Sequence, residues 1–241
     1  MMRSGNPALR ESVFTKAVPA ADGSIMTIGG TVNKTMILLF LVVITASWTW
    51  SLGVNALPYI APAAIFGLVA AIVTIFKKDI SHITAPVYAL LEGVVLGGIS
   101  SVFEKQYPGI VIQAVALTFG TLFCLLAAYK TGIIKATENF KLGVVAATGA
   151  IAVVYIVSMI MGFFGASMPM IHSTGPMGII FSLFVVTIAA LNLVLDFDFI
   201  ERGAESNAPG YMEWYGAFGL IVTLIWLYLE ILRLLSKLQR R

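Results

Sequence analysis

Long apolar stretches separated by short polar loops dominate the chain after Lys34. A helix needs about 20 residues to cross about 30 Å of hydrocarbon, and seven of these stretches are long enough to do so. Their side chains do not alternate between polar and apolar, which favours helices over the strands of a membrane barrel. The pattern therefore predicts an all-α membrane protein with spans at residues 35–57, 58–76, 83–103, 110–129, 142–165, 177–200 and 218–238.

Residues 1–34 have a different character from the rest of the chain. They contain Arg3, Arg10, Lys16 and Lys34 among Gly, Ser, Asn and Pro residues, without an apolar core of signal-peptide length. We expect residues 1–34 to form a short flexible cytoplasmic tail and residues 35–241 to form one transmembrane domain.

Composition supports the membrane assignment and excludes several function classes. The chain is 59% hydrophobic and only 11% charged, with a mean hydropathy of +0.95, whereas soluble domains have about 25% charged residues. The net charge of +3 is spread thinly, so no basic stripe for nucleic acid is present. One cysteine, Cys124, and two isolated histidines, His82 and His172, lack the spacing of a zinc site. No motif of a nucleophilic or metal-dependent enzyme is visible, so we expect neither an enzyme nor a resident cofactor, and membrane lipid as the surrounding partner.

The distribution of Lys and Arg predicts the orientation of the chain. With the tail inside, ten basic residues fall on the cytoplasmic side and five on the other, which is the bias that cytoplasmic loops show. The basic C-terminus, "RLLSKLQRR", disagrees with this bias if all seven segments cross. Either the last segment crosses despite its charge, or one segment is re-entrant.

Two predicted spans contain isolated acids. Glu92 lies about ten residues into the third span, near mid-depth, where an ionised acid costs roughly 2.5–3.5 kcal/mol. It must be protonated, paired or hydrated, and it acts either as a hydrogen-bonded structural acid or in a proton or cation path. Glu230 lies in the last span, and Arg233 follows it at i+3, which favours a structural ion pair.

The stretch "LNLVLDFDFIE" at residues 191–201 holds the densest acids. On a helix, Asn192 and Asp196 share one face and Asp198 and Glu201 share another, while the two aspartates are about 200° apart. They therefore do not form a site with each other. Asp198 and Glu201 can be solvated at a helix end, but Asp196 lies one turn deeper.

Two motifs resemble a known family. "LLEGVVLGGIS" is similar to the Glu-Gly-x-x-Leu-Gly signature of the Bax inhibitor-1 family. "LNLVLDFDFIERG", followed by "YMEWYGAFGLIVTLIWLYLEILRLL", resembles the final two helices of the bacterial YccA-like branch. The resemblance covers the chain after Lys34 and implies a seven-helix bundle around its last helix, in the inner membrane. For bacterial members it implies a pH-sensitive calcium leak.

The resemblance also implies a gate made of two aspartates on the sixth and seventh helices. The sixth-helix aspartate matches Asp198 or Asp196, while the seventh-helix position falls at Thr223, which does not titrate. Glu230 or Glu213 are the alternatives for the second acid. Asp196 and Asp198, together with Asn192, Thr223 and main-chain carbonyls, would offer a weak, transient Ca²⁺ site. The transported ion would be Ca²⁺ or H⁺. The alternative function is a regulator that binds another membrane protein, such as the FtsH protease, through the N-terminal tail.

Overall fold

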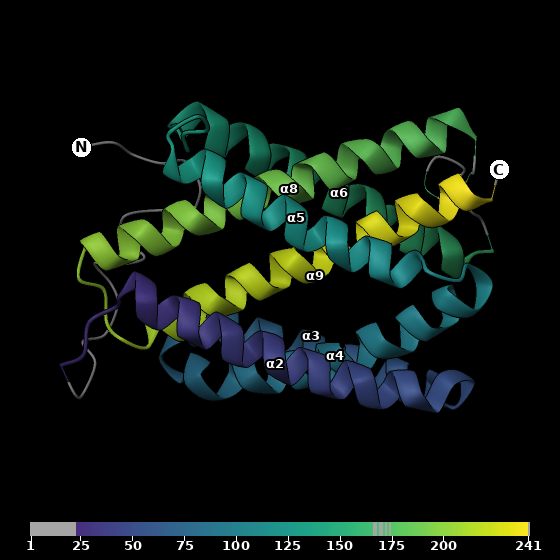
Figure 1. Cartoon of the computed structure of the whole chain (residues 1–241), viewed down its shortest axis with the longest axis horizontal. Coiled ribbons are helices and arrows are strands. Elements are labelled where there is room, and N and C mark those ends of the chain that lie inside the picture. Colours follow the sequence, from purple (N-terminus) through teal and green to yellow (C-terminus); the bar gives the residue numbers. More distant parts are fainter. Residues whose placement is uncertain (1–22, 166–167, 169–170, 172, 174, 241) are drawn as a thin grey trace. The chain divides into compact units, whose positions relative to one another are not determined.

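Seven long apolar helices form the framework of the part of the chain that the structure describes (Figure 1). The structure is a computed structural model, and it describes residues 23–165, 168, 171, 173 and 175–240. The helices are α2 (Ile28–Leu52), α3 (Leu57–Phe76), α4 (Ser81–Gln106), α5 (Ile110–Lys130), α6 (Glu138–Phe163), α8 (Pro176–Glu205) and α9 (Met212–Gln239), with short 3-10 turns η1 (Gly53–Ala56) and η2 (Lys78–Ile80). The predicted all-α, seven-span class is confirmed. Of the seven, α9 is the most buried.

The first helix begins earlier than the hydrophobic pattern predicted. Thr27 has extended backbone and its hydroxyl accepts a hydrogen bond from the Gly30 amide at 2.9 Å, which caps α2. Residues 28–34, which the sequence assigned to the tail, are therefore helical. The same helix ends at Leu52 rather than at residue 57, because Gly53 takes a positive φ of 55° there. Residues 1–22 lie outside the described part.

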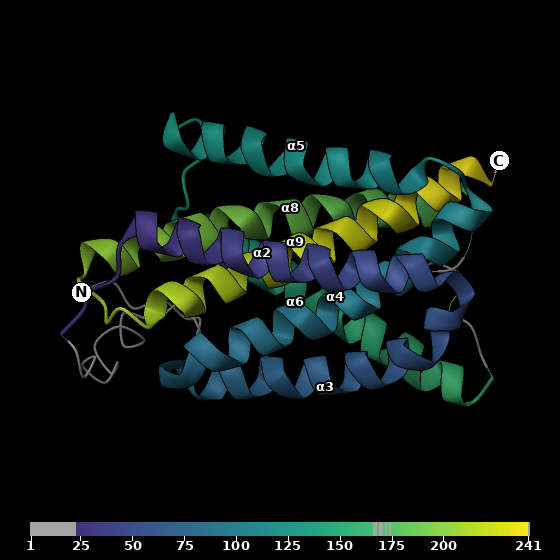
Figure 2. The ribbon, with the colours of Figure 1, turned by 60° about the horizontal axis from the view of Figure 1, so that its bottom comes forward.

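The chain divides into two compact units, and each includes part of α8 and of α9. The described residues of the second unit are 23–108 and 198–222. Within it, α4 packs against α2 and against α3 (Figures 1 and 2). Gly93 and Gly97 make the close approach to α2 possible, since a Cβ at Gly93 would collide with Thr45 and Val42. This is the close contact between small residues that is typical of membrane helices.

The described residues of the first unit lie within 109–197 and 223–240, hence it holds α5, α6, the first part of α8 and the last part of α9. Ile151 of α6 and Val185 and Ile188 of α8 form a buried cluster, against which Trp226 of α9 packs. The α8 and α9 segments run antiparallel here, because residues early in α8 contact residues late in α9. This helix pair positions most of the acids singled out in the sequence.

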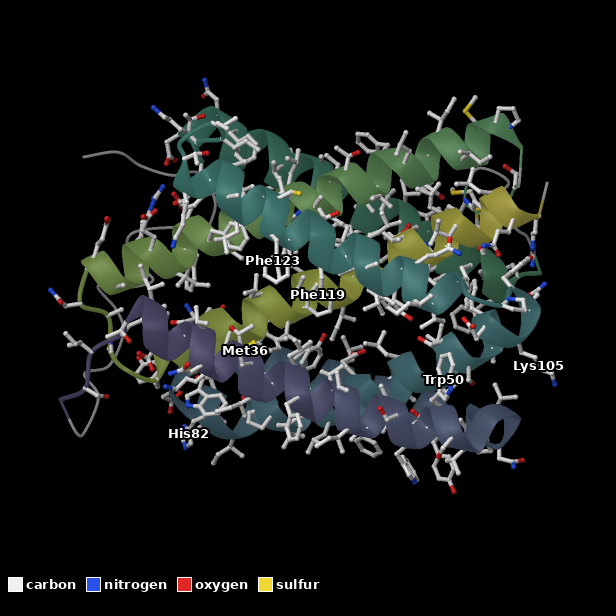
Figure 3. The ribbon with its side chains drawn as sticks, viewed as in Figure 1. Met36, Trp50, His82, Lys105, Phe119 and Phe123 are labelled. Atoms are coloured by element: carbon white, nitrogen blue, oxygen red, sulfur yellow. The ribbon has the colours of Figure 1, made fainter. Side chains whose placement is uncertain are left out.

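Large apolar side chains are exposed along several helices. Met36 is 61% exposed, and Phe123, which stacks on Phe119, is 63% exposed (Figure 3). Exposed apolar side chains on helices of this length fit lipid as the surrounding solvent. His82 and Lys105 mark the two ends of α4 in the same view.

Candidate functional site

Asp196 lies on α8, and its carboxyl group faces α9. The side chain of Thr223 on α9 lies next to this carboxyl group and interacts with it. The second oxygen, Oδ2, is buried and has no hydrogen-bond partner within the described residues. A buried carboxylate oxygen without a partner is costly, so this atom is a point where a proton or a cation would bind favourably.

Asp198 has a different environment from Asp196, although only two residues separate them. Its carboxylate pairs with Arg202 one turn further along α8, with Nε–Oδ2 at 3.0 Å and Nη2–Oδ1 at 3.2 Å. The Arg202 side chain is 43% exposed. Asp198 is thus paired within its own helix, whereas Asp196 faces α9.

Asn192 binds across to α6 rather than to the acid on its own helix. Its Nδ2 donates to Thr148 Oγ1 and to the Ile188 carbonyl, both at 2.8 Å. The helix face that carries Asn192 and Asp196 therefore also has a polar contact with α6, through Thr148.

Glu230 of α9 is almost fully buried, with a side-chain exposure of 3%. The predicted pair with Arg233 is present, because Arg233 Nη1 donates to both carboxylate oxygens at 2.9 and 3.1 Å. Tyr155 of α6 completes the cluster: its hydroxyl donates to Glu230 at 2.9 Å and accepts from Arg233 Nη1 at 2.7 Å. The charge of Glu230 is compensated within this cluster.

Lys237, which sequence reasoning missed, is also buried, with 5% exposure. Its ammonium donates to Ser182 Oγ at 2.8 Å and to the Gly178 carbonyl at 3.0 Å.

The spacing of polar residues in the sequence could have revealed the position of Lys237. Thr223, Glu230 and Lys237 recur every seven residues, and Ser182 and Asp196 are fourteen residues apart. We call the resulting set the polar stripe; it consists of Ser182, Asn192 and Asp196 of α8, Thr223, Glu230 and Lys237 of α9, and Thr148 and Tyr155 of α6.

Glu92 lies on α4 in the other unit and is half-buried. It faces α3, where a Cβ added at Gly67 would lie 3.2 Å from Glu92 Oε1. Tyr88, one turn earlier on α4, is close enough to interact with it electrostatically. Glu92 is therefore a candidate of its own within the second unit.

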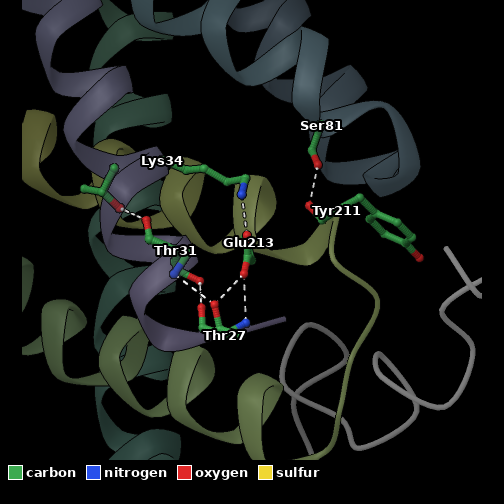
Figure 4. Close-up of polar contacts among 8 residues, drawn as sticks. Thr27, Thr31, Lys34, Ser81, Tyr211 and Glu213 are labelled. Carbon is green, nitrogen blue, oxygen red and sulfur yellow. Dashed lines mark hydrogen bonds and ion pairs between the residues drawn. The ribbon is translucent and has the colours of Figure 1, made fainter. Parts of the chain in front are cut away.

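Glu213, the other alternative for the second acid, binds the start of α2 (Figure 4). Its Oε1 accepts from the Thr27 amide at 2.9 Å and from the Thr27 hydroxyl at 2.8 Å. Lys34 forms an ion pair with Oε2. The carboxylate thus satisfies the first donors of a helix and one lysine, which is a structural task.

Metal binding by a cluster of acids finds no support in the described ranges, where no group of three His, Cys, Asp or Glu side chains could hold an ion. The two calcium ligands expected from the sequence, Asp196 and Asp198, have separate partners, Thr223 and Arg202. Any cation at Asp196 would therefore be held by one carboxylate and neutral oxygens, which fits a transient ion better than a resident one.

Comparison with known proteins places the chain in a family. The pattern of the family described as Bax inhibitor 1 like matches residues 6–240. No curated protein matches the chain.

Proposed function

The chain belongs to the Bax inhibitor 1 like family, and from that premise we propose that it is a pH-sensitive cation leak of the bacterial inner membrane, with calcium as the ion. Membership itself suggests a channel or transporter type of role for this multi-pass membrane protein. Calcium, the pH response and the YccA-like branch belong to the proposal.

One observation carries the proposal: the buried, unpartnered Oδ2 of Asp196. A proton and a cation would compete for this oxygen, because either one removes the cost of a bare buried charge. Acidification then favours the protonated, closed site. At higher pH the oxygen is deprotonated and can bind the cation. Thr223 supplies a hydroxyl where the family's paired-aspartate gate has a second acid, so a single acid carries the pH response here.

Calcium flux into dye-loaded proteoliposomes, measured from about pH 6 to 8, tests the proposal. Asp196→Asn should abolish most of the pH dependence, because the amide cannot exchange the proton. Asp198→Asn is the matched control, since Arg202 already neutralises that acid, and it should keep the wild-type pH response. Identical pH profiles for wild type and Asp196→Asn, or a wild type that carries no calcium, would refute it.

A second function is supported by the way the segment before α2 is held. Met26 N donates to the Ala208 carbonyl at 2.6 Å, and Gly210 N donates to the Ser24 carbonyl at 2.9 Å. A partner that pulls on the N-terminal tail would therefore act directly on the α8–α9 loop. A membrane protease such as FtsH is the proposed partner. Deletion of residues 1–20 should abolish co-purification with that protease while leaving calcium flux unchanged.

The proposed orientation places the N-terminus in the cytoplasm, and we propose that the protein is not an enzyme. The excess of basic residues on the tail side supports this orientation. A reporter fused before Met1 should be cytoplasmic, and with seven crossings a reporter after Arg241 should lie outside. A cytoplasmic C-terminal reporter would overturn the seven crossings in favour of a re-entrant segment.

A further inference from the structure

Lys237 is a buried cation of the first unit whose hydrogen-bond acceptors are both neutral. Its ammonium is held by one main-chain carbonyl, that of Gly178, and by one hydroxyl, that of Ser182. Rings of carbonyl and hydroxyl oxygens are what proteins use to replace the water around a permeating monovalent cation. An ammonium group and a potassium ion have similar size and the same charge, so the same oxygens can accept either.

The position of these oxygens connects them with Asp196. On α8, Ser182 precedes Asp196 by fourteen residues, and on α9, Lys237 follows Thr223 by fourteen. Four turns of helix correspond to about 21 Å. Because both separations are equal and the helices are antiparallel, Asp196–Thr223 and Ser182–Lys237 lie on the same seam between α8 and α9, at two levels.

Glu230 lies between the two levels of this seam. Its carboxylate is buried and already compensated by Arg233, and both groups are close enough to Lys237 to act on it electrostatically. The charge of Glu230 is therefore compensated by Arg233 without a hydrogen bond to Lys237 among those of the described residues. The hydrogen bonds of the ammonium go instead to two neutral oxygens, the Gly178 carbonyl and the Ser182 hydroxyl.

We propose that Gly178 and Ser182 form a monovalent-cation site on the α8 side of the polar stripe, and that Lys237 occupies it as a tethered cation. In this state the lysine keeps free potassium-sized ions out of the stripe. The role of Lys237 as a barrier to flux rests on the proposed leak, whereas the cation site itself does not.

Binding is tested on the full chain in detergent, through the midpoint of thermal unfolding in KCl and in choline chloride at equal ionic strength. Lys237→Ala vacates the oxygens, so K⁺ should raise its midpoint above the value in choline, which is too large for the site. Wild type should show no such difference. A second variant, Lys237→Ala with Ser182→Ala, should lose the K⁺ effect because one ligand is gone.

Lys141→Ala is the matched control. Lys141 is a lysine of the same unit with similar burial, 4% exposed, but its ion-pair partner is the carboxylate of Glu138. It should show no K⁺-specific stabilisation. The proposed site would be overturned if Lys237→Ala unfolds at the same midpoint in both salts, or if it fails to fold in both.

Flux separates this inference from the proposed function. If the leak exists, Lys237→Ala should raise K⁺ flux per folded molecule by about tenfold, as expected when a fixed like charge leaves an ion path, and Lys237→Arg should not. A wild type and a Lys237→Ala variant that both fail to conduct would refute the leak but not the cation site, provided the K⁺-specific stabilisation is found. Flux that is equal in wild type and in a K⁺-binding Lys237→Ala variant would refute the barrier role.

Discussion

The side chain of Thr223 on α9 lies next to the carboxyl group of Asp196 on α8 and interacts with it. The resemblance noted in the sequence implies a second aspartate at the position of Thr223, and threonine does not titrate, so this contact has only one titratable member. The second oxygen of Asp196 remains without a partner in the described part of the chain. An acid introduced at position 223 would therefore lie next to Asp196.

Replacing Thr223 by Asp should restore a two-acid site. Two carboxylates in one buried place share a proton and release their protons in coupled, separated steps. The leak of Thr223→Asp should therefore respond to pH over a wider range than wild type, as measured by calcium flux in proteoliposomes. Thr223→Asn, similar in shape but without a titratable proton, should not broaden the response; the same broadening in both variants would contradict this explanation.

Glu92→Gln should fold and should alter the leak. The amide is nearly isosteric, and Glu92 faces the α3 backbone at Gly67, so the packing of α3 on α4 should persist. If the carboxylate belongs to a hydrated path, flux per folded molecule or its pH dependence should change. Unchanged flux, with a lower yield of folded protein in detergent, would instead assign Glu92 a structural role.

Gly93→Val should destabilise the packing of α2 on α4. The added side chain would collide with Thr45 and with the Val42 backbone, and overpacking of a tight contact costs about 1–3 kcal/mol. The loss should appear as a lower unfolding midpoint in detergent. Gly149→Val on α6 is the control, because a Cβ there meets nothing within 4 Å; an equal loss in both variants would show that helix propensity, not collision, is responsible.

Glu213→Gln should loosen the start of α2. The substitution removes the ion pair with Lys34 and weakens the two hydrogen bonds from Thr27, at a cost of about 1–3 kcal/mol. Faster amide hydrogen exchange at Thr27 and Gly30 would localise the effect. Glu138→Gln removes a longer, 3.5 Å pair with a 44% exposed acid, and should change stability by less than about 1 kcal/mol.

The repeating apolar stretches determined the fold class by themselves. A chain with this many apolar segments of spanning length must satisfy its backbone within each segment, and only helices do so in lipid. The same local logic predicted the Glu230–Arg233 pair, since residues three apart on one helix are neighbours wherever that helix packs. Both results depend on spacing along the chain.

Helix ends and partners between helices required the tertiary structure. The hydrophobic pattern placed the start of the first span at residue 35, but the cap at Thr27 and its bonds to Glu213, 186 residues away, extend α2 to Ile28. The choice between Asp196 and Asp198 was open in the sequence, because both acids lie on one helix. Only packing showed that Thr223 faces the first, whereas the pair of the second with Arg202 is a local i,i+4 contact that spacing along the helix could have predicted. Lys237 was overlooked for the same reason: a lysine near the end of a span usually extends to the membrane surface, and only the antiparallel register of α8 and α9 turns it toward Ser182.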